Sequence, residues 1–557
     1  IVVFVYFVLV TAQFQVLRYF KDGLDMLLIR ELGGGSVWSA FYYVVSEFGT
    51  LILLLIAVLM SVGVLIVFSV RLISHIIDFT PAIGWMCSLL TPKRLLLLNL
   101  AVFLVVFGIT LYFPVLNKNL GYSLAHHAYT APWQFITDFD FDGYSLVKRP
   151  VDHAPFDADR HPYAFEILGN AVDENGVGGD LEENIWNQPS IDWTDKDFST
   201  HNVLLIVLES ARADLYHARY KDQWVMPTLR SLPGQDLSIV AHTAFTAPAI
   251  TSIFNGTLSR HEKGLSLIDH LNSLGYRTGV FSAQNEGFGN QDSATGLKRA
   301  GYFFDSRSIS PDKRMHLSSS AIASAIPARE ILAQFESWLR ADDVQHFFAY
   351  INLQELHFPY SHATIEKPLL NNLLSRYEIN EKETDWLRET YYNAARVIDN
   401  AIAYLVDLLK KTGRFDNTVI LVVGDHGEEL FDFASLGHGT DINFEQNSVI
   451  GKIINSAWTP DGRIPIGLSE VPKLIHNALV KQDHHTVPMR GSVLAFNGAR
   501  KPIQIGLFTD KGLIKYDFRK DIWSRQSEYG VKEKPAVPDT GLIHLWESYV
   551  LSTSSSR

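Results

Sequence analysis

Residues 418–429 read TVILVVGDHGEE, an apolar run that ends in an acid and a histidine, Asp425 and His426. A second apolar run, NVLLIVLES at 202–210, also ends in an acid, Glu209. Neighbouring parallel strands that each end in an acid can place both carboxylates at one edge of the sheet, where open α/β folds bind their ligands. The two stretches therefore predict an α/β fold with carboxylates gathered at one sheet edge.

A third stretch, TAPAITSIFNG at 246–256, opens with Thr246 and continues as a short helical pattern. Glu209, Asp425 and His426 offer oxygen and nitrogen ligands for a metal. The Thr246 hydroxyl would complete this ligand set and serve as a nucleophile that the metal activates. The alternatives are a plain helix N-cap for Thr246 and structural hydrogen bonds for the acids and the histidine.

Strand-like and helix-like patterns alternate after residue 202, which favours an α/β domain with a largely parallel sheet. Strands are predicted at 203–208, 278–282, 347–353 and 419–423, and helices from 226 onward and at 265–274 and 385–411. Asp399 falls within the last of these helices, where capping or packing is its expected role. Glu428 and Glu429 are expected to form a solvated helix start.

Hydrophobic residues make up 47% of the 557 residues and are concentrated near the N-terminus. The uncharged runs at 48–70 and 95–117 are each long enough to span about 30 Å of hydrocarbon. The apolar run at 1–17 is a further candidate span, with a signal peptide as the competing interpretation. Lys93 and Arg94 favour a cytoplasmic loop before the last span, which would leave the rest of the chain outside the cytoplasm.

The expected regions are a transmembrane helical domain at 1–117, a connector with interfacial helices at 118–200 and a catalytic domain at 201–557. The connector carries an aromatic cluster that suits a membrane surface, although a packed linker would explain it too: Trp133, Phe135, Phe139 and Phe141. The net charge of −12 does not favour nucleic acid binding. A single cysteine, Cys87, excludes a disulfide framework.

The order and spacing of these segments resemble the alkaline phosphatase superfamily, in its sulfatase-fold branch. Members carry a strand that ends in an acidic metal ligand, then a nucleophile ten residues before a glycine, then a helix–strand pair that ends in D-H-G. Residues 391–428, YYNAARVIDNAIAYLVDLLKKTGRFDNTVILVVGDHGE, are close to this pattern, and the resemblance covers roughly residues 200–520. It implies a sulfatase-like α/β/α domain in which residues 494–525 form a small antiparallel sheet.

The residue at the nucleophile position distinguishes the branches of this superfamily. Sulfatases place a Cys or Ser there, within C/S-x-P-x-R, which is oxidised to formylglycine. This chain has Thr246 at that position and Ile250 in place of the Arg, and a threonine cannot form the aldehyde. Threonine nucleophiles are typical of the phosphoryl-transferring members: lipoteichoic acid synthases, phosphoethanolamine and phosphoglycerol transferases, and nucleotide pyrophosphatase/phosphodiesterases. Glu209, where sulfatases usually have Asp, also resembles the membrane transferases.

The resemblance implies a metal-dependent transferase anchored in the bacterial inner membrane, with its catalytic domain in the periplasm or at the cell exterior. It would move phosphoethanolamine or phosphoglycerol from a phospholipid to an envelope glycan or glycolipid through a phospho-threonine. One divalent metal, zinc or manganese, is expected on four residues, Glu209, Thr246, Asp425 and His426.

His357 and His438 match histidines that lie near the substrate phosphate in the family, where they would contact the phosphate or act as general acid. Structural roles remain open for both. Two other functions also remain open: a metal-dependent phosphodiesterase or phosphatase that uses water as acceptor, and a catalytically silent member that senses lipids. The sequence offers no convincing second set of metal ligands, which makes the two-metal hydrolases a weaker match.

Overall fold

The computed structural model describes residues 124–554 except for 148–149, 187–190, 195–197, 259–264, 316–324, 342–345, 482–485 and 499–500, together with a few residues between 93 and 105. Contacts divide the described residues into two compact units, one that ends at Ala164 and one that begins at Phe165. The predicted spans at 1–17 and 48–70, and nearly all of 95–117, lie outside the described residues. None of the helices in the described part of the chain combines the length and apolar character of a membrane span.

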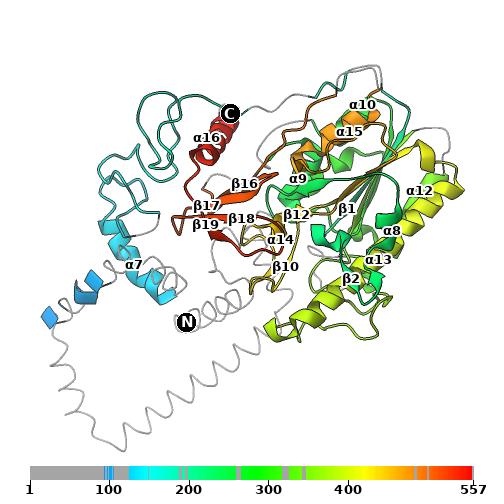
Figure 1. The fold of residues 1–557 in the computed structure, drawn as a ribbon, viewed down its shortest axis with the longest axis horizontal. Helices are drawn as coiled ribbons and strands as arrows, with labels where there is room; N and C mark the ends of the chain where they lie inside the picture. Colours follow the sequence, from blue (N-terminus) through cyan, green and yellow to red (C-terminus); the bar gives the residue numbers. More distant parts are fainter. Residues whose placement is uncertain are drawn as a thin grey trace, which may run out of the picture. The chain divides into compact units, whose positions relative to one another are not determined.

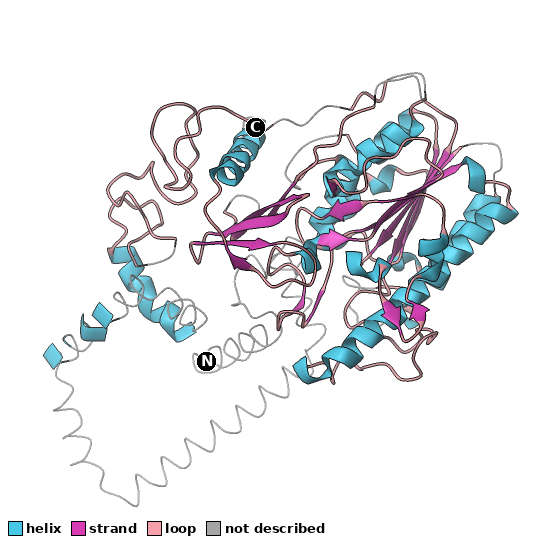
Figure 2. Ribbon diagram, viewed as in Figure 1, coloured by secondary structure: helices cyan, strands magenta, loops and turns pink. Residues whose placement is uncertain are grey.

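The described part of the smaller unit consists mainly of helix α7 (Leu124–Ile136) and the irregular chain that follows it (Figure 2). Phe135 and Phe141, from the predicted aromatic cluster, are 71% and 74% exposed. Phe139 stacks on Phe156 with 5.2 Å between the ring centroids. Exposed aromatic rings suit contact with a membrane surface, and that contact stays a prediction.

A seven-stranded sheet forms the centre of the larger unit, in the order β4-β13-β9-β1-β8-β6-β7. Its strands are β1 (Asn202–Leu208), β4 (Gln235–Asp236), β6 (Arg277–Ser282), β7 (Tyr302–Phe304), β8 (Phe347–Leu353), β9 (Thr418–Gly424) and β13 (Gly451–Ile454). Figure 1 labels β1, its middle strand. The strands from β9 to β7 are parallel, as the alternating patterns predict. β13 is antiparallel to β9 and to β4, so the sheet is mixed at this edge. An antiparallel neighbour needs no long crossover helix, and none separates β9 from β13.

Strands β1, β8 and β9 are buried along their whole length because helices cover both faces of the sheet (Figure 2). Alternate residues of a strand point to opposite faces. Leu204 and Ile206 therefore pack into one hydrophobic core, and Val203 and Leu205 into the other. The first core includes α12 (Ala328–Arg340) and α13 (Thr384–Lys411), and the second includes α9 (Thr246–Asn255), α10 (Leu267–Ser273) and α15 (Val471–Leu479). This arrangement is the α/β/α sandwich that the resemblance implies.

A five-stranded antiparallel sheet follows, as expected for residues 494–525. Helix α16 (Thr540–Ser554) comes after it and packs Trp546 on Phe496, with ring centroids 5.2 Å apart. Part of the predicted connector also packs on this helix, because Asn175 Nδ2 donates to Glu547 Oε1 at 2.6 Å. The strands are β15 (Val493–Asn497), β16 (Gln504–Thr509), β17 (Gly512–Asp517), β18 (Ile522–Gln526) and β19 (Lys534–Pro535).

Asp399 has the structural role that the sequence predicts. Its buried carboxylate accepts the backbone N–H groups of Thr228 and Leu229, each at 2.9 Å, at the start of the short helix α8 (Pro227–Ser231). It therefore ties α13 to α8. The remaining short elements are β2 (Arg219–Tyr220), β3 (Gln223–Trp224), β5 (Ser238–Val240), β10 (Glu429–Leu430), β11 (Leu436–Gly437), β12 (Ser448–Val449), β14 (Pro465–Gly467), α11 (Gln291–Ala294) and α14 (Phe444–Asn447).

His242 is buried in a setting that accepts only its neutral form. Its Nδ1 lies 2.7 Å from the carbonyl oxygen of Leu494 and therefore donates to it. Its Nε2 accepts from the Ser469 hydroxyl at 2.9 Å and from the Ser469 N–H at 3.3 Å. A proton on Nε2 would oppose the backbone donor. Burial accordingly lowers the pKa of His242 to about 4.

We expect acid to destabilise the fold through His242. The unfolded chain binds a proton at a pKa of about 6.5, whereas the folded chain does so only at about 4. The contribution of neutral His242 to the free energy of unfolding is therefore fully present above pH ~6.5. It falls by about 3 kcal/mol as the pH drops to ~4. Denaturant titrations of the full chain across this range measure the slope. His242→Asn should flatten it and the exposed His217→Asn should not, so equal slopes in both variants would contradict the assignment.

Candidate metal centre and active site

Three side chains follow three adjacent parallel strands at the carboxyl edge of the sheet. Glu209 follows β1, Asp425 follows β9 and Gln354 follows β8. The backbone continues the ladder here: Glu209 N donates to Leu353 O at 3.0 Å, and Asp425 N to Leu208 O at 3.3 Å. The predicted meeting of Glu209 and Asp425 at one edge is therefore confirmed.

Thr246 is the first residue of α9, and its hydroxyl points into this cluster. Oγ1 donates to Glu209 Oε1 at 3.0 Å and lies 3.2 Å from His426 Nε2. The N-cap of α9 is Phe245, and the Thr246 hydroxyl is directed at Glu209 and His426. The plain N-cap interpretation of Thr246 is therefore wrong. Since Thr246 is only half-buried, its hydroxyl can be approached from outside.

The backbone around His426 fixes the orientation of the imidazole ring. Nδ1 lies 2.9 Å from the carbonyl of Gly427 and therefore carries the proton. Nε2 then faces the acids, 3.3 Å from Glu209 Oε1 and 3.5 Å from Asp425 Oδ2. A side chain at Gly427 would place its Cβ 2.0 Å from the carbonyl oxygen of Glu445, so only glycine fits after the histidine.

The buried charges of this cluster shift one another's pKa values. Burial opposes ionisation of Glu209, but the hydrogen bond and charge of His426 outweigh it and hold the pKa of Glu209 below its ordinary value. Burial and the Glu209 carboxylate raise the pKa of Asp425 well above its ordinary value. Burial lowers the pKa of His426, but the charges of Asp425 and Glu209 outweigh it and raise that pKa to about 10. The cluster thus favours a cation beside Nε2, either a proton or a divalent metal.

One carboxylate oxygen of Asp425, Oδ2, is buried without a hydrogen-bond donor among the described residues. Oδ1 accepts the N–H groups of Ser210 and His426 at 2.9 and 2.8 Å. Oδ2 is buried and has no hydrogen-bond partner among the described residues. Such an oxygen is costly unless it binds a cation. Ligand atoms of Glu209, Asp425 and His426 lie within 4.8 Å of one another, so these residues fit a divalent metal, with the Thr246 hydroxyl beside them.

Gln354 is a member of the site that the sequence did not predict. Its Nε2 donates to Glu209 Oε2 at 2.9 Å and to Asn352 Oδ1 at 2.9 Å. This bond occupies the second oxygen of Glu209 and leaves Oε1 directed at Thr246 and His426. Its position is the sequence feature that indicates a role, because Gln354 directly follows the predicted strand at 347–353, as Glu209 and Asp425 follow theirs.

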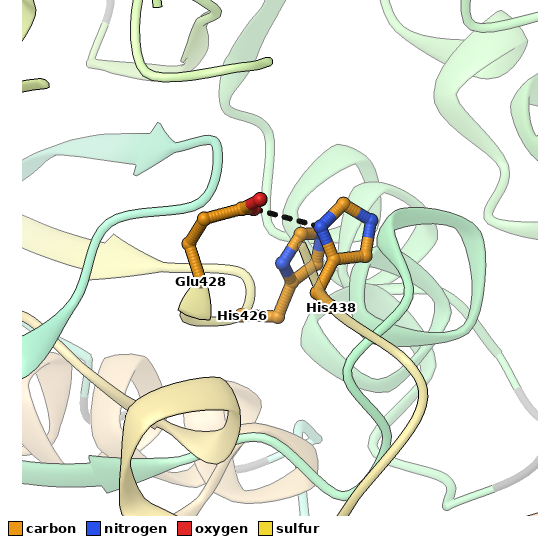
Figure 3. A group of neighbouring side chains, drawn as sticks. All are labelled: His426, Glu428 and His438. Atoms are coloured by element: carbon orange, nitrogen blue, oxygen red, sulfur yellow. Dashed lines mark hydrogen bonds and ion pairs between the residues drawn. The ribbon is translucent and has the colours of Figure 1, made fainter. Parts of the chain in front are cut away.

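His438 lies against the cluster on the loop that follows β11 (Figure 3). Its ring centroid is 4.0 Å from that of His426, and its Nδ1 donates to Glu428 Oε2 at 2.8 Å. Glu428 also accepts from the Tyr360 hydroxyl at 2.8 Å. These bonds hold the His438 ring with Nδ1 directed at Glu428. They leave Nε2 as the nitrogen that can exchange a proton with a substrate.

The prediction that Glu428 and Glu429 form a solvated helix start is wrong. Glu428 is fully buried, and Glu429, the first residue of the short strand β10, is 1% exposed. Glu429 is buried because it accepts from Ser435 and Asn443. A second group able to hold a metal also exists among the described residues, formed by His426, Glu428 and His438. This set could not be predicted from the sequence, because the position of Glu428 after Asp-His-Gly is typical of an exposed acid.

His357 is exposed on the otherwise largely buried segment that follows β8. Its Nδ1 donates to the carbonyl of Phe358 at 2.8 Å. Its backbone N–H donates to the carbonyl oxygen of Gln354 at 3.0 Å, which places it directly after a member of the cluster. The predicted residues thus gather in one region, with Glu209, Asp425 and His426 at its buried centre and His357 at the solvent side.

Comparison with known families decides the assignment. The sulfatase family model matches residues 201–489, which include all of these residues. The chain belongs to the sulfatase family. None of the curated proteins matches the sequence.

Solved structures similar to this sulfatase-family chain have low sequence identity to it. The lipoteichoic acid synthase LtaP from Listeria monocytogenes is 15% identical, with a TM-score of 0.49 over 66% of this chain and 95% of that one. The periplasmic domain of EptC from Escherichia coli, in complex with zinc, is 13% identical, with a TM-score of 0.42 over 51% and 84%. The periplasmic domain of the phosphoethanolamine transferase EptC from Campylobacter jejuni is 16% identical, with a TM-score of 0.40 over 52% and 97%.

Proposed function

We propose that this chain is a metal-dependent transferase that moves a phosphoryl-linked head group, phosphoethanolamine or phosphoglycerol, from a phospholipid to an envelope glycan or glycolipid. The observation that carries the proposal is the half-buried Thr246 hydroxyl, held between Glu209 and His426. A threonine in this place supports phosphoryl transfer over formylglycine chemistry, because it cannot be oxidised to the aldehyde. Residues with the chemistry of a nucleophile, a cation site and an acid–base group all lie within reach of one another.

In the first half-reaction, Thr246 Oγ1 forms a bond to phosphorus while the bond from phosphorus to the diacylglycerol oxygen breaks. The hydroxyl proton leaves along the existing hydrogen bond toward Glu209. His438, in its doubly protonated form, donates the Nε2 proton to the departing oxygen and keeps the Nδ1 proton on Glu428, so that diacylglycerol leaves as a neutral alcohol. Glu428 acts on His438 as a positioning residue, through the bond at 2.8 Å. The product of this half-reaction is a phosphodiester of Thr246 that carries the head group.

In the second half-reaction, an acceptor hydroxyl attacks the same phosphorus and the bond to Thr246 Oγ1 breaks. His438, now neutral, takes the acceptor's proton on Nε2, and Glu209 returns to Thr246 Oγ1 the proton that it took in the first half-reaction. Glu209, Asp425, His426 and Thr246 would hold a divalent metal, which when bound lowers the pKa of the threonine hydroxyl and offsets phosphate charge. Oxygen ligands with one imidazole suit zinc or manganese better than calcium.

The location of the enzyme is part of the proposal. A lipid donor stays in the bilayer, so membrane spans at 1–117 would keep the site beside its substrate. We place the catalytic domain on the periplasmic or outer side, as the Lys93–Arg94 pair favours.

Proteoliposomes with labelled phosphatidylethanolamine or phosphatidylglycerol test the reaction. We expect diacylglycerol to form, and the labelled head group to appear on an added envelope glycolipid in preference to water. A site that excludes water and positions an acceptor hydroxyl gains an effective molarity of about 10⁵ M or more. Release of free phosphoethanolamine or phosphoglycerol with no acceptor product would favour the hydrolase. No diacylglycerol with any lipid would favour the silent lipid-sensing alternative.

A further inference from the structure

An acidic loop follows α7 in the smaller unit, far along the chain from the residues of the active site. Residues 138–143 read DFDFDG, so acids alternate with phenylalanines up to a glycine. The two phenylalanines are 46% and 74% exposed. One carboxylate oxygen from each of Asp138, Asp140 and Asp142 lies within 4.8 Å of the others.

The carboxylates of this loop converge with few hydrogen-bond donors around them. Asp138 Oδ1, both oxygens of Asp140 and Asp142 Oδ2 are buried and accept no hydrogen bond within the described part of the chain. The other oxygens bind backbone N–H groups of the loop itself: Gly143 N donates to Asp138 Oδ2 at 3.1 Å, and Tyr144 N to Asp142 Oδ1 at 2.7 Å. Repulsion between the acids is therefore not offset by these bonds.

Asp152 is an independent observation at the same place. It is only 2% exposed, and its Oδ1 accepts from Ala154 N at 2.9 Å. Its Oδ2 has no hydrogen-bond partner among the described residues. Its backbone N–H donates to the carbonyl oxygen of Ser145 at 3.3 Å, which holds Asp152 against the end of the loop. A buried carboxylate beside other carboxylates is costly unless a cation lies between them.

We propose that Asp138, Asp140, Asp142 and Asp152 bind one calcium ion. Calcium takes about 6–8 oxygen ligands in flexible geometry, which suits several carboxylates on an irregular loop. Zinc prefers nitrogen and sulfur ligands, and none is contributed by these residues. The ion would tie two parts of the chain after α7 to each other, through carboxylates that lie ten residues apart.

The spacing of the loop supports calcium over a general cation. Acids at alternate positions followed by glycine, D-x-D-x-D-G, form the start of a calcium-binding loop, in which the glycine makes a sharp turn. Gly143 has a φ of +93°, which residues with a side chain rarely adopt. The twelfth position of such a loop usually holds a bidentate glutamate, but here it is Arg149. Asp152 is the carboxylate that takes over this contribution.

Asp140→Asn tests the proposal with little risk to the fold, because neither oxygen of Asp140 accepts a hydrogen bond within the described residues. Radioactive calcium in equilibrium dialysis measures binding to the detergent-solubilised full chain. We expect the wild type to bind one calcium ion with at least about tenfold higher affinity than Asp140→Asn. The exposed Asp159→Asn makes the same charge change in the same unit and should bind like the wild type.

Thermal unfolding supplies a second readout, since a ligand that binds only the folded chain raises the melting temperature. Calcium should raise it for the wild type and Asp159→Asn but not for Asp140→Asn. Equal calcium binding by the wild type and Asp140→Asn, or no binding by the wild type, would overturn the proposal. Displacement of the bound calcium by an equal concentration of magnesium would overturn the assignment to calcium.

Discussion

Thr246→Ala should lower turnover of the lipid donor by about 10³-fold or more, because no other group can form the phosphodiester intermediate. The side chain is the only hydroxyl within hydrogen-bond distance of both Glu209 Oε1 and His426 Nε2 among the described residues. Since Thr246 does not cap its helix, the variant should stay folded, with a loss of no more than about 2 kcal/mol. Release of diacylglycerol from labelled phospholipid measures the effect.

Two matched variants separate loss of the nucleophile from a general effect of losing a threonine hydroxyl. Thr251→Ala makes the same change on the same helix, where the hydroxyl donates to the carbonyl of Ala247 at 2.8 Å, and should keep its activity. Thr246→Ser keeps a hydroxyl and should retain part of the turnover. A labelled head group should stay on the wild-type chain after quenching, and not on Thr246→Ala. Full turnover by folded Thr246→Ala would rule out Thr246 as nucleophile.

The ends of β1 and β9 could be predicted from the sequence because a long apolar run precedes each of them. The runs before Glu209 and Asp425 are buried on both faces of the sheet, so their composition is close to uniform and their ends are sharp. Parallel pairing of β1 with β9 then brings the two acids together. Thr246 could be predicted because it begins a helical pattern, and because this stretch lies between the two strands in the same order as in the family.

Neighbours that come from distant parts of the chain could not be predicted. Glu428 follows Gly427 and looks like an ordinary exposed acid, yet it is buried by Tyr360 and His438. Gln354 is neutral and carries no pattern of its own, and its role depends on contact with Glu209, 145 residues away. The strands of the mixed edge, β4 and β13, were not predicted, because runs of two and four residues carry too little of an apolar pattern.

Arg212 should be among the most costly residues to replace, although sequence patterns gave it no role. Its side chain is 1% exposed and lies just after β1. It pairs with Asp214 at 2.8 Å and with Asp432 at 2.7 Å, and donates to the carbonyl of Glu428 at 2.9 Å. Arg388 also pairs with Asp432, at 2.8 Å. Arg212 thus fixes the segment that carries Glu428, which in turn orients His438.

Replacing this arginine leaves charges without a partner. Burial opposes ionisation of Asp432, but the charges of Arg212 and Arg388 outweigh it and keep the pKa of Asp432 below its ordinary value. A depressed carboxylate pKa stabilises the fold above the unfolded pKa of about 3.9, and that stabilisation is lost as the pH falls. Near neutral pH, Asp432 is ionised in the folded chain, so losing Arg212 leaves that charge with the Arg388 guanidinium and the Leu430 N–H.

We expect Arg212→Met to lower the free energy of unfolding by about 3–5 kcal/mol at neutral pH, because methionine fills the space but leaves Asp432 ionised and poorly compensated. Denaturant titrations of the full chain measure the loss. Adding Asp432→Asn to this variant removes the uncompensated negative charge, so the double variant should be more stable than Arg212→Met alone. Lowering the pH toward 4 should also narrow the gap between the wild type and Arg212→Met, because protonation of Asp432 removes the charge. A variant as stable as the wild type at neutral pH, or a double variant less stable than the single one, would show that the ion pairs of Arg212 do not hold this segment in place.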